Sequence, residues 1–146
     1  MDQSDSLKLS NQLCFAVYSA AHAFNAAYKP LLEPLGLTYP QYLVLIVLWE
    51  EDGRMVREIG ERLNLDSGTL TPMLKRLEAA GFVKRTRDKK DERQVHIHLN
   101  EKAREARPAA IEARRAIVCA LGDSEDEVQK MKQAVDQLET MLRNAA

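Results

Sequence analysis

The sequence predicts a mainly α-helical protein with one small β-hairpin, and three observations lead to this fold class. Apolar residues recur at helical spacing through most of the chain. Only residues 82–99 show the apolar and polar alternation that is typical of strands. The 146 residues have the length of one domain and can bury about two thirds of the surface exposed on unfolding. We therefore expect a single domain over 1–146, with a central unit at about 37–100 and helical regions at about 7–35 and 101–146.

The first helical region carries an apolar stripe that also surrounds a cysteine. The stripe consists of Leu9, Leu13, Ala16, Val17, Ala20, Phe24, Ala27 and Leu31. Ser6 or Ser10 is available as the N-cap, and Pro34 and Gly36 end the region. An unpaired cysteine such as Cys14 is most often a buried small hydrophobe. With Ser10 as the N-cap, Cys14 would instead end the first helical turn, where the helix dipole modestly favours a thiolate.

A second helix is predicted to begin at TYP, with Pro40 in its first turn, and to run through YLVLIVLW to Asp52 and Gly53. The helix is apolar nearly all round, which predicts that it lies at the centre of the core. Tyr42 and Trp49 belong to it, and we interpret both as core residues rather than as parts of a ligand site.

Two short helices follow, separated by about three residues, which is the spacing of a helix-turn-helix. The first, VREIGERLNL, places three apolar residues on one face: Val56, Ile59 and Leu63. The second, LDSGTLTPMLKRLEAAG, is predicted to begin after the N-cap Asp66 and to end at Gly81. Pro72 would then lie inside the helix; a start at Thr71, with Pro72 at the first helical position, stays open, but it leaves part of the apolar stripe unexplained.

After the second helix the apolar period changes from that of a helix to that of a strand. FVKRTR and QVHIHL predict a two-stranded hairpin whose loop, DKKDER, is charged throughout. On the second strand, Val95, Ile97 and Leu99 share one face, and Gln94, His96 and His98 form the outward face. A helix-turn-helix followed by a charged hairpin predicts a winged helix. The histidines, with His22, lack any CxxC or HxxxH spacing, so no metal site is expected.

The chain closes with two more helical stretches whose charge differs from that of the middle. They are NEKAREARPAAIEARRAIVCAL, with an expected bend at Pro108, and DEVQKMKQAVDQLETML. The net charge is only −1, but residues 75–93 hold eight basic and four acidic residues, whereas residues 123–146 hold three basic and six acidic ones. The local basic excess predicts an anionic partner for the middle of the chain.

In a winged helix the second helix of the helix-turn-helix enters the major groove of DNA, and its N-terminal turns read the bases. The exposed candidates for base contacts are Ser67, Gly68, Thr69 and Thr71. The candidates for phosphate contacts are Lys75, Arg76 and Lys84. Arg87 and Arg93 in the wing could reach the minor groove. The alternative is a solvated helix with ordinary surface charge.

Several stretches resemble one family of regulators. DSGTLTPMLKRLEAAGFVKRTRD and DERQVHIHL resemble the MarR family of winged-helix repressors. LCFAVY, YKPLLEPLGLTYPQYLVLIVLWE and the second cysteine near the end extend the resemblance along nearly the whole chain to its organic-hydroperoxide branch, OhrR. The resemblance implies a homodimer whose terminal helices, at about 7–35 and 101–146, interlock, and which binds an inverted-repeat operator in double-stranded DNA.

The same resemblance implies a redox switch of the two-cysteine type. An organic hydroperoxide would oxidise Cys14 to the sulfenic acid. Tyr28 and Tyr39 of the partner subunit would hydrogen-bond the reduced sulfur and favour the thiolate. The disulfide would then join Cys14 of one subunit to Cys119 of the other. For Cys119 the alternative is a buried filler between Val118 and Ala120.

The remaining expectations concern cofactors, compartment and rival functions. No run of about 18 apolar residues and no signal-peptide pattern occurs, so we expect a cytosolic protein without a membrane partner, whose two cysteines are thiols at rest. We expect no cofactor and no enzymatic activity. Two other functions stay open: a repressor released by a phenolic or other small apolar ligand, and a thiol peroxidase that uses both cysteines.

Overall fold

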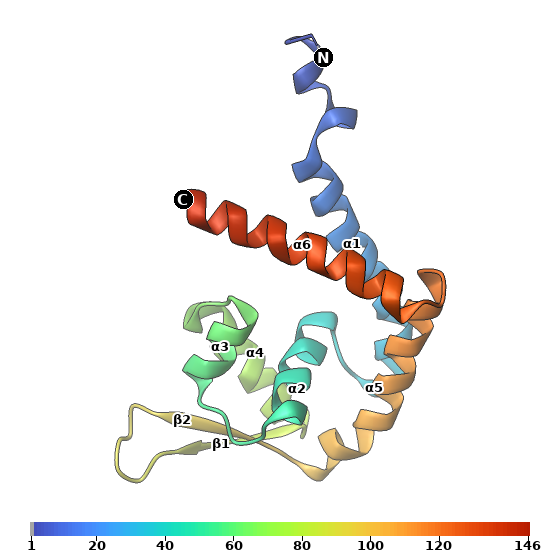
Figure 1. Ribbon diagram of the computed structural model, residues 1–146. Helices are drawn as coiled ribbons and strands as arrows, with labels where there is room; N and C mark the ends of the chain where they lie inside the picture. The colour runs from blue at the N-terminus through green and yellow to red at the C-terminus, as the bar shows by residue number, and fades with distance from the viewer. Residues whose placement is uncertain (1) are drawn as a thin grey trace. The chain divides into compact units, whose positions relative to one another are not determined.

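The computed structural model describes residues 2–146, which divide into two compact units, one up to Ala110 and one of Ile111–Ala146. The elements follow in the order α1 (Leu13–Leu32), α2 (Tyr39–Glu50), α3 (Val56–Leu63), α4 (Ser67–Ala79), β1 (Val83–Arg87), β2 (Val95–Leu99), α5 (Glu101–Ala120) and α6 (Glu125–Ala145) (Figure 1). The predicted fold class, mainly α-helical with one small hairpin, is confirmed.

Helix α1 begins later than the sequence predicted. Short 3₁₀ turns within residues 5–11 precede it, and Gln12 occupies the N-cap position without a side-chain capping bond, so the predicted caps Ser6 and Ser10 are wrong. The Gln12 Nε2 amide instead donates to the Ser6 carbonyl at 2.6 Å, which holds the chain in a turn before the helix begins. Cys14 is therefore the second residue of α1 and lies within its first turn, not at the end of that turn.

Helix α1 is buried only near its C-terminal end. Residues 13–27 are all exposed, whereas Tyr28 and Leu32 are buried. Pro30 lies in the last turn, and Gly36, with φ of 73°, ends the following 3₁₀ turn as predicted. Most of the apolar stripe of this helix is therefore exposed.

Helix α2 forms the centre of the core, as predicted. The Thr38 hydroxyl accepts a hydrogen bond from the Gln41 backbone N–H, and the Gln41 side chain accepts one from Thr38 N–H, so the helix begins with a capping box and with Pro40 in its first turn. Five of its side chains are buried: Tyr42, Val44, Leu45, Val47 and Leu48. Half-buried Trp49 donates its indole N–H to the Ala103 carbonyl at 3.1 Å, which joins α2 to the start of α5.

Helices α3 and α4 form the predicted helix-turn-helix. Asp66 caps α4, since its Oδ1 accepts a hydrogen bond of 2.7 Å from Thr69 N–H, and the alternative start at Thr71 is wrong. Gly60 in α3 allows the turn to pack closely, because a Cβ atom there would lie 2.7 Å from the Leu65 carbonyl oxygen. Helix α4 buries three leucines against this turn and the core: Leu70, Leu74 and Leu77.

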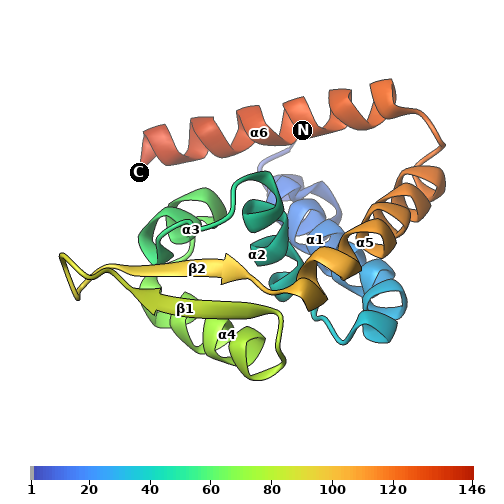
Figure 2. The ribbon, with the colours of Figure 1, turned by 90° about the horizontal axis from the view of Figure 1, so that it is seen from below.

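The hairpin pairs β1 with β2 in antiparallel register, from Val83 opposite Leu99 to Arg87 opposite Val95 (Figure 2). The inward face of β2 is confirmed by the burial of Ile97 and Leu99. On its other edge, β2 also pairs with the segment before α3, through the Ile97 N–H to the Arg54 carbonyl and a bridge between Met55 and His96. The hairpin is thereby fixed to the helix-turn-helix by backbone hydrogen bonds.

The C-terminal helices are regular. Pro108 lies inside α5 without interrupting it. Helix α6 begins at the N-cap Ser124, and none of its described residues is buried. Within residues 2–146, no single helix is both long and apolar enough to span a membrane, although Leu13–Leu35 and Tyr39–Glu50, bent by 72°, meet that requirement as a pair.

Candidate functional site

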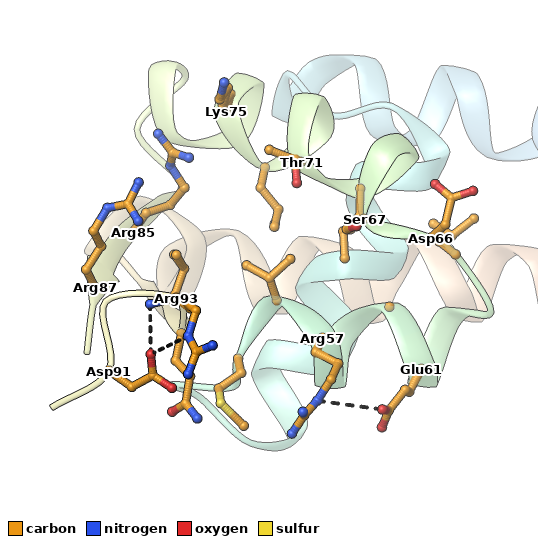
Figure 3. A pocket seen from close by; sticks show the side chains of 18 of the residues that line it. Arg57, Glu61, Asp66, Ser67, Thr71, Lys75, Arg85, Arg87, Asp91 and Arg93 are labelled. Atoms are coloured by element: carbon orange, nitrogen blue, oxygen red, sulfur yellow. Dashed lines mark hydrogen bonds and ion pairs between the residues drawn. The ribbon is translucent and has the colours of Figure 1, made fainter. Parts of the chain in front are cut away.

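A cleft of about 920 Å³ lies between α3, α4 and the hairpin. Figure 3 shows Ser67, Thr71 and Lys75 of α4 on one side of it, and Arg57 and Glu61 of α3 on the other. The hairpin supplies three arginines at one end: Arg85, Arg87 and Arg93. The cleft is therefore rich in cationic side chains from all three elements and can accept an anionic chain alongside α4.

The nine residues predicted to contact DNA all lie on α4 and the hairpin. Five of them line the cleft: Ser67, Thr71, Lys75, Arg87 and Arg93. The other four do not line it: Gly68, Thr69, Arg76 and Lys84. All nine are exposed except half-buried Thr71. Arg57 of α3 lines the same cleft. It was not among the predicted contacts, because the winged-helix pattern assigns DNA contacts to the second helix and the wing.

Asp66 organises the N-terminal turn of α4. Its carboxylate accepts the Thr69 N–H, and the hydrogen bonds from Thr69 and Gly68 lower the pKa of Asp66 below its usual value. The carboxylate thus stays ionised and keeps the small residues of this turn in helical geometry.

Glu78 and Arg85 connect the end of α4 to strand β1. Glu78 Oε2 accepts the Arg85 backbone N–H at 3.0 Å, and Oε1 accepts the Arg85 Nε–H at 3.1 Å. These contacts, the backbone N–H first, lower the pKa of Glu78. Arg85 is one of the eight basic residues of 75–93, but its guanidinium is paired with Glu78, and this contact joins the hairpin to α4.

The loop of the hairpin is closed by Asp88. Its backbone N–H donates to the Gln94 carbonyl at 2.8 Å, and its Oδ1 accepts the Lys90 N–H at 2.8 Å. The Lys90 N–H is the main cause of the lowered pKa of Asp88. At the tip, Arg93 Nε–H donates to Asp91 Oδ1 at 3.2 Å (Figure 3). The loop therefore has a defined shape that presents its basic side chains.

His96 is not simply an outward-facing surface residue. It is half-buried, with Nδ1 at 3.0 Å from the Gly53 carbonyl and Nε2 at 3.3 Å from Asp88 Oδ2. The Gly53 contact is the largest cause of its raised pKa, and Asp88 adds to it. His98 on the same strand is exposed. The strand pattern gave no signal for this role, because Gly53 lies 43 positions away in the sequence.

The two tyrosines predicted to support the thiol lie side by side within one chain. The ring centroids of Tyr28 and Tyr39 are 5.2 Å apart, and Tyr42 completes the cluster at 5.1 Å from Tyr28. Burial raises the pKa of Tyr39, and the neighbouring Tyr28 adds to the rise. Tyr42 was predicted only as a core residue, and it is buried.

Both cysteines are free and exposed. Neither has the burial expected of core filler, so that interpretation is wrong for Cys119 as for Cys14. Cys14 precedes Tyr28 by fourteen positions on α1, which corresponds to about 21 Å along the helix axis. Residues 2–146 contain no cluster of three His, Cys, Asp or Glu side chains that could hold a metal ion.

Comparisons with known proteins identify a group of regulators. The family profile described as transcriptional regulator SarA/Rot matches residues 26–108. The HTH-type transcriptional regulator TtmR of Methylorubrum extorquens (strain PA1) is 66% identical over 102 residues, which are 70% of this chain and only 52% of that protein. The chain thus spans about half of its length. The organic hydroperoxide resistance transcriptional regulator of Bacillus subtilis (strain 168) is 45% identical over 138 residues, 94% of this chain and 92% of that one.

Among solved structures, the chain is similar to AbfR of Staphylococcus epidermidis. The reduced, DNA-bound form has a TM-score of 0.83 at 39% identity and covers 96% of this chain and 97% of AbfR. The disulfide form has a TM-score of 0.66 at the same 39% identity, with 97% and 94% covered. This chain therefore has a backbone more similar to that of the reduced form of this relative.

Proposed function

Because the chain belongs to the SarA/Rot and MarR-type winged-helix transcriptional regulators, we propose that it is a DNA-binding repressor that organic hydroperoxides inactivate through Cys14. One observation carries the proposal. The Cys14 thiol is exposed at the start of an exposed apolar helix, in a chain 45% identical to an organic hydroperoxide resistance regulator over 94% of its length.

In the proposed complex, α4 enters the major groove of double-stranded DNA. Base contacts come from the first turns of α4: Ser67, Gly68, Thr69 and Thr71. Phosphate contacts come from Lys75, Arg76 and Lys84. The wing places Arg87 and Arg93 in the minor groove. The basic cleft beside α4 and the DNA-bound structures of AbfR support this assignment.

The proposed repressor is a homodimer held by its terminal helices, at about 7–35 and 101–146. Helix α1 exposes five large apolar side chains: Leu13, Phe15, Val17, Tyr18 and Phe24. Helix α6 exposes four more: Met131, Val135, Met141 and Leu142. Apolar surface of this extent marks an interaction site, and a second copy of the chain offers the complementary surface. A two-fold dimer would read an inverted repeat whose half-sites lie on one side of the DNA.

The proposed chemistry uses both cysteines. The Cys14 thiolate attacks the terminal oxygen of an organic hydroperoxide, and an S–O bond forms as the O–O bond breaks. The alkoxide leaves and takes a proton from solvent to become the alcohol, so that the peroxide is reduced and the sulfur is oxidised to the sulfenic acid. The thiolate of Cys119 from the other subunit then attacks this sulfur, the S–O bond breaks, and hydroxide leaves and takes a proton to become water as the disulfide forms. Before oxidation, the hydroxyls of Tyr28 and Tyr39 from the other subunit hydrogen-bond the Cys14 sulfur. A single α1 separates Cys14 from Tyr28 by about 21 Å, so this contact requires the second copy.

The disulfide would change the DNA-binding geometry. It requires the two Cα atoms to approach to about 4.4–6.8 Å. Such an approach moves the terminal helices of the dimer, and with them the spacing of the two copies of α4. The lower similarity of this chain to disulfide-formed AbfR supports two distinct backbone states in this family.

The test measures DNA binding by fluorescence anisotropy, on a duplex that the reduced protein selects from a random library. Wild type, Cys14→Ser and Cys119→Ser are compared with and without stoichiometric cumene hydroperoxide, followed by a non-reducing gel. We expect peroxide to release wild type, to leave Cys14→Ser bound, and to give a dithiol-reversible band at dimer mass only in wild type.

Two results would contradict the proposal. Retention of wild type on DNA after peroxide treatment would refute redox sensing and favour a repressor released by a small apolar ligand. Many turnovers of hydroperoxide per protein in the presence of a dithiol would favour a thiol peroxidase.

A further inference from the structure

We propose that His96 is a positioning residue that holds the wing in its DNA-binding geometry, and that the imidazolium form holds it more firmly than the neutral ring. This inference rests on the proposed DNA binding and adds a proton-dependent element to it. The wing is the hairpin loop at residues 88–93 together with the adjoining ends of β1 and β2.

The hydrogen-bond geometry at His96 favours a doubly protonated ring. Both partners of the ring are acceptors: the Gly53 carbonyl oxygen at 3.0 Å from Nδ1 and Asp88 Oδ2 at 3.3 Å from Nε2. A neutral imidazole has one N–H and can donate to only one of them, whereas the imidazolium donates to both. Loss of the proton therefore breaks one of the two contacts.

The two contacts connect parts of the fold that are far apart in the sequence. Gly53 belongs to the turn between α2 and α3, next to the segment that pairs with β2. Asp88 closes the wing loop, because its other oxygen accepts the Lys90 and Asp91 backbone N–H groups. The His96 side chain therefore joins the wing loop to the turn that precedes α3.

The charged groups around His96 also favour the imidazolium. Asp88 faces it from the wing loop, and the negative charge of Glu58 in α3 adds a smaller favourable effect. The Glu58 carboxylate is itself paired with the Arg54 guanidinium at 3.6 Å, which moderates its effect. The carboxylate that contacts the His96 ring is thus that of Asp88, which belongs to the wing loop.

The direction of the pH effect follows from these contacts. The pKa of His96 is raised above its usual 6.5 in the folded chain. The stabilising contribution is fully present below the unfolded pKa and is lost as the pH rises through the higher folded pKa. The wing should therefore be more ordered at pH 6 than at pH 8.

The experiment measures DNA affinity from about pH 5.5 to 8.5 at constant ionic strength, because phosphate contacts depend on salt. Reduced wild type, His96→Gln and His98→Gln are compared on the selected duplex. As the pH rises over this range, we expect the DNA affinity of wild type to fall about three- to tenfold more than that of His96→Gln, as loss of one hydrogen bond implies. His98→Gln, which removes an exposed histidine from the same strand, should keep the wild-type slope. Equal slopes for wild type and His96→Gln would overturn the inference.

A second measurement on the free protein separates failure of the inference from failure of the proposed function. Hydrogen-exchange protection of the Lys90 and Asp91 amides should decrease as His96 loses its proton with rising pH. The imidazole NMR signals of His96 follow this titration. Asp88→Asn, which keeps the Oδ1 acceptor but removes the charge, should weaken the coupling between this protection and pH. Protection that does not follow the His96 titration would refute the role of His96 in holding the wing, whereas a chain that selects no duplex would refute only the DNA-binding function.

Discussion

The DNA-facing part of the molecule, which consists of α3, α4 and the wing, is held together by contacts within one chain. The thiol part around Cys14 is proposed to need contacts from a second copy. In the first, α3, α4 and the wing are joined within one chain by the contacts of Glu78 with Arg85 and of His96 with Gly53 and Asp88. In the thiol part, Cys14 lies at the start of a helix exposed from residue 13 to 27. Of the two tyrosines proposed to support it, Tyr28 lies in the C-terminal half of that helix and Tyr39 begins α2.

This difference explains how such a protein could act as a switch. A DNA-reading unit that is fixed internally keeps its shape while the distance to its copy changes. A sensor that is assembled only between two copies converts a covalent change into a change of that distance.

The strongest test introduces charge on the exposed stripe of α1. Phe24→Glu should dissociate the dimer, because it places a charge in the apolar surface that a second copy would cover. Loss of two-site binding should lower DNA affinity more than about 100-fold, and stoichiometric peroxide should no longer give the band at dimer mass. Light scattering after gel filtration gives the mass. Asn25→Glu is the control, since Asn25 is turned about 100° away around the helix. If the Phe24→Glu protein stays dimeric, the exposed stripe of α1 is not the surface that a second copy covers.

The tyrosine cluster provides a matched pair of variants for the thiol part. Tyr28→Phe keeps the packed ring but removes the hydroxyl proposed to hydrogen-bond the Cys14 sulfur of the other subunit. Because hydrogen bonds to charged groups contribute about 1.5–3 kcal/mol, oxidation of Cys14 should slow by at least about tenfold. Stopped-flow kinetics with cumene hydroperoxide measure the rate. Tyr42→Phe changes the neighbouring ring, 5.1 Å from Tyr28, and should leave the rate unchanged. Equal rates for Tyr28→Phe and wild type would remove the tyrosine from the proposed sensor.

Local chemistry made most of the fold predictable from the sequence. The cap at Asp66 depends on an acceptor three residues before the N–H that it binds, and such a pattern is visible in the sequence. The same reasoning failed at Ser6 and Ser10. There, the Gln12 side chain bonds back to an earlier carbonyl and delays the start of α1, an alternative that serine propensities do not reveal.

The site was predictable only where its residues are close in sequence. The residues of α4 follow directly from the helix-turn-helix pattern. The roles of Arg85 and His96 depend on partners brought together by the fold, and the hairpin pattern treated both as surface residues. Whether Cys14 meets Tyr28 depends on a second copy, which no pattern within one chain specifies.

A smaller effect is expected from single phosphate contacts. Lys75→Ala removes an exposed cation from the cleft beside α4. Affinity should fall about three- to tenfold for all duplex sequences alike, and the dependence of log affinity on log salt should decrease by about 1. Anisotropy titrations at several salt concentrations measure both. Lys130→Ala is the control, because Lys130 also carries a positive charge but belongs to α6 and not to α3, α4 or the wing. A sequence-selective loss for Lys75→Ala would indicate that this side chain reads bases.

The smallest expected effect concerns the link between α4 and the wing. The pKa of Glu78 is lowered from 4.5 mainly by the Arg85 backbone N–H, so its stabilising effect is present above the unfolded pKa and is lost as the pH falls through the lower folded value. The difference in Tm between wild type and Glu78→Gln should therefore be constant near pH 7 and shrink below about pH 4.5. It should also be modest, since the Glu78 side chain is 38% exposed and solvent screens the pair. Glu92→Gln at the exposed wing tip is the control. If both variants lose the same Tm at every pH, the hairpin is held to α4 by its backbone pairing and packing alone, and the DNA-facing part is less tightly linked than the contacts of Glu78 indicate.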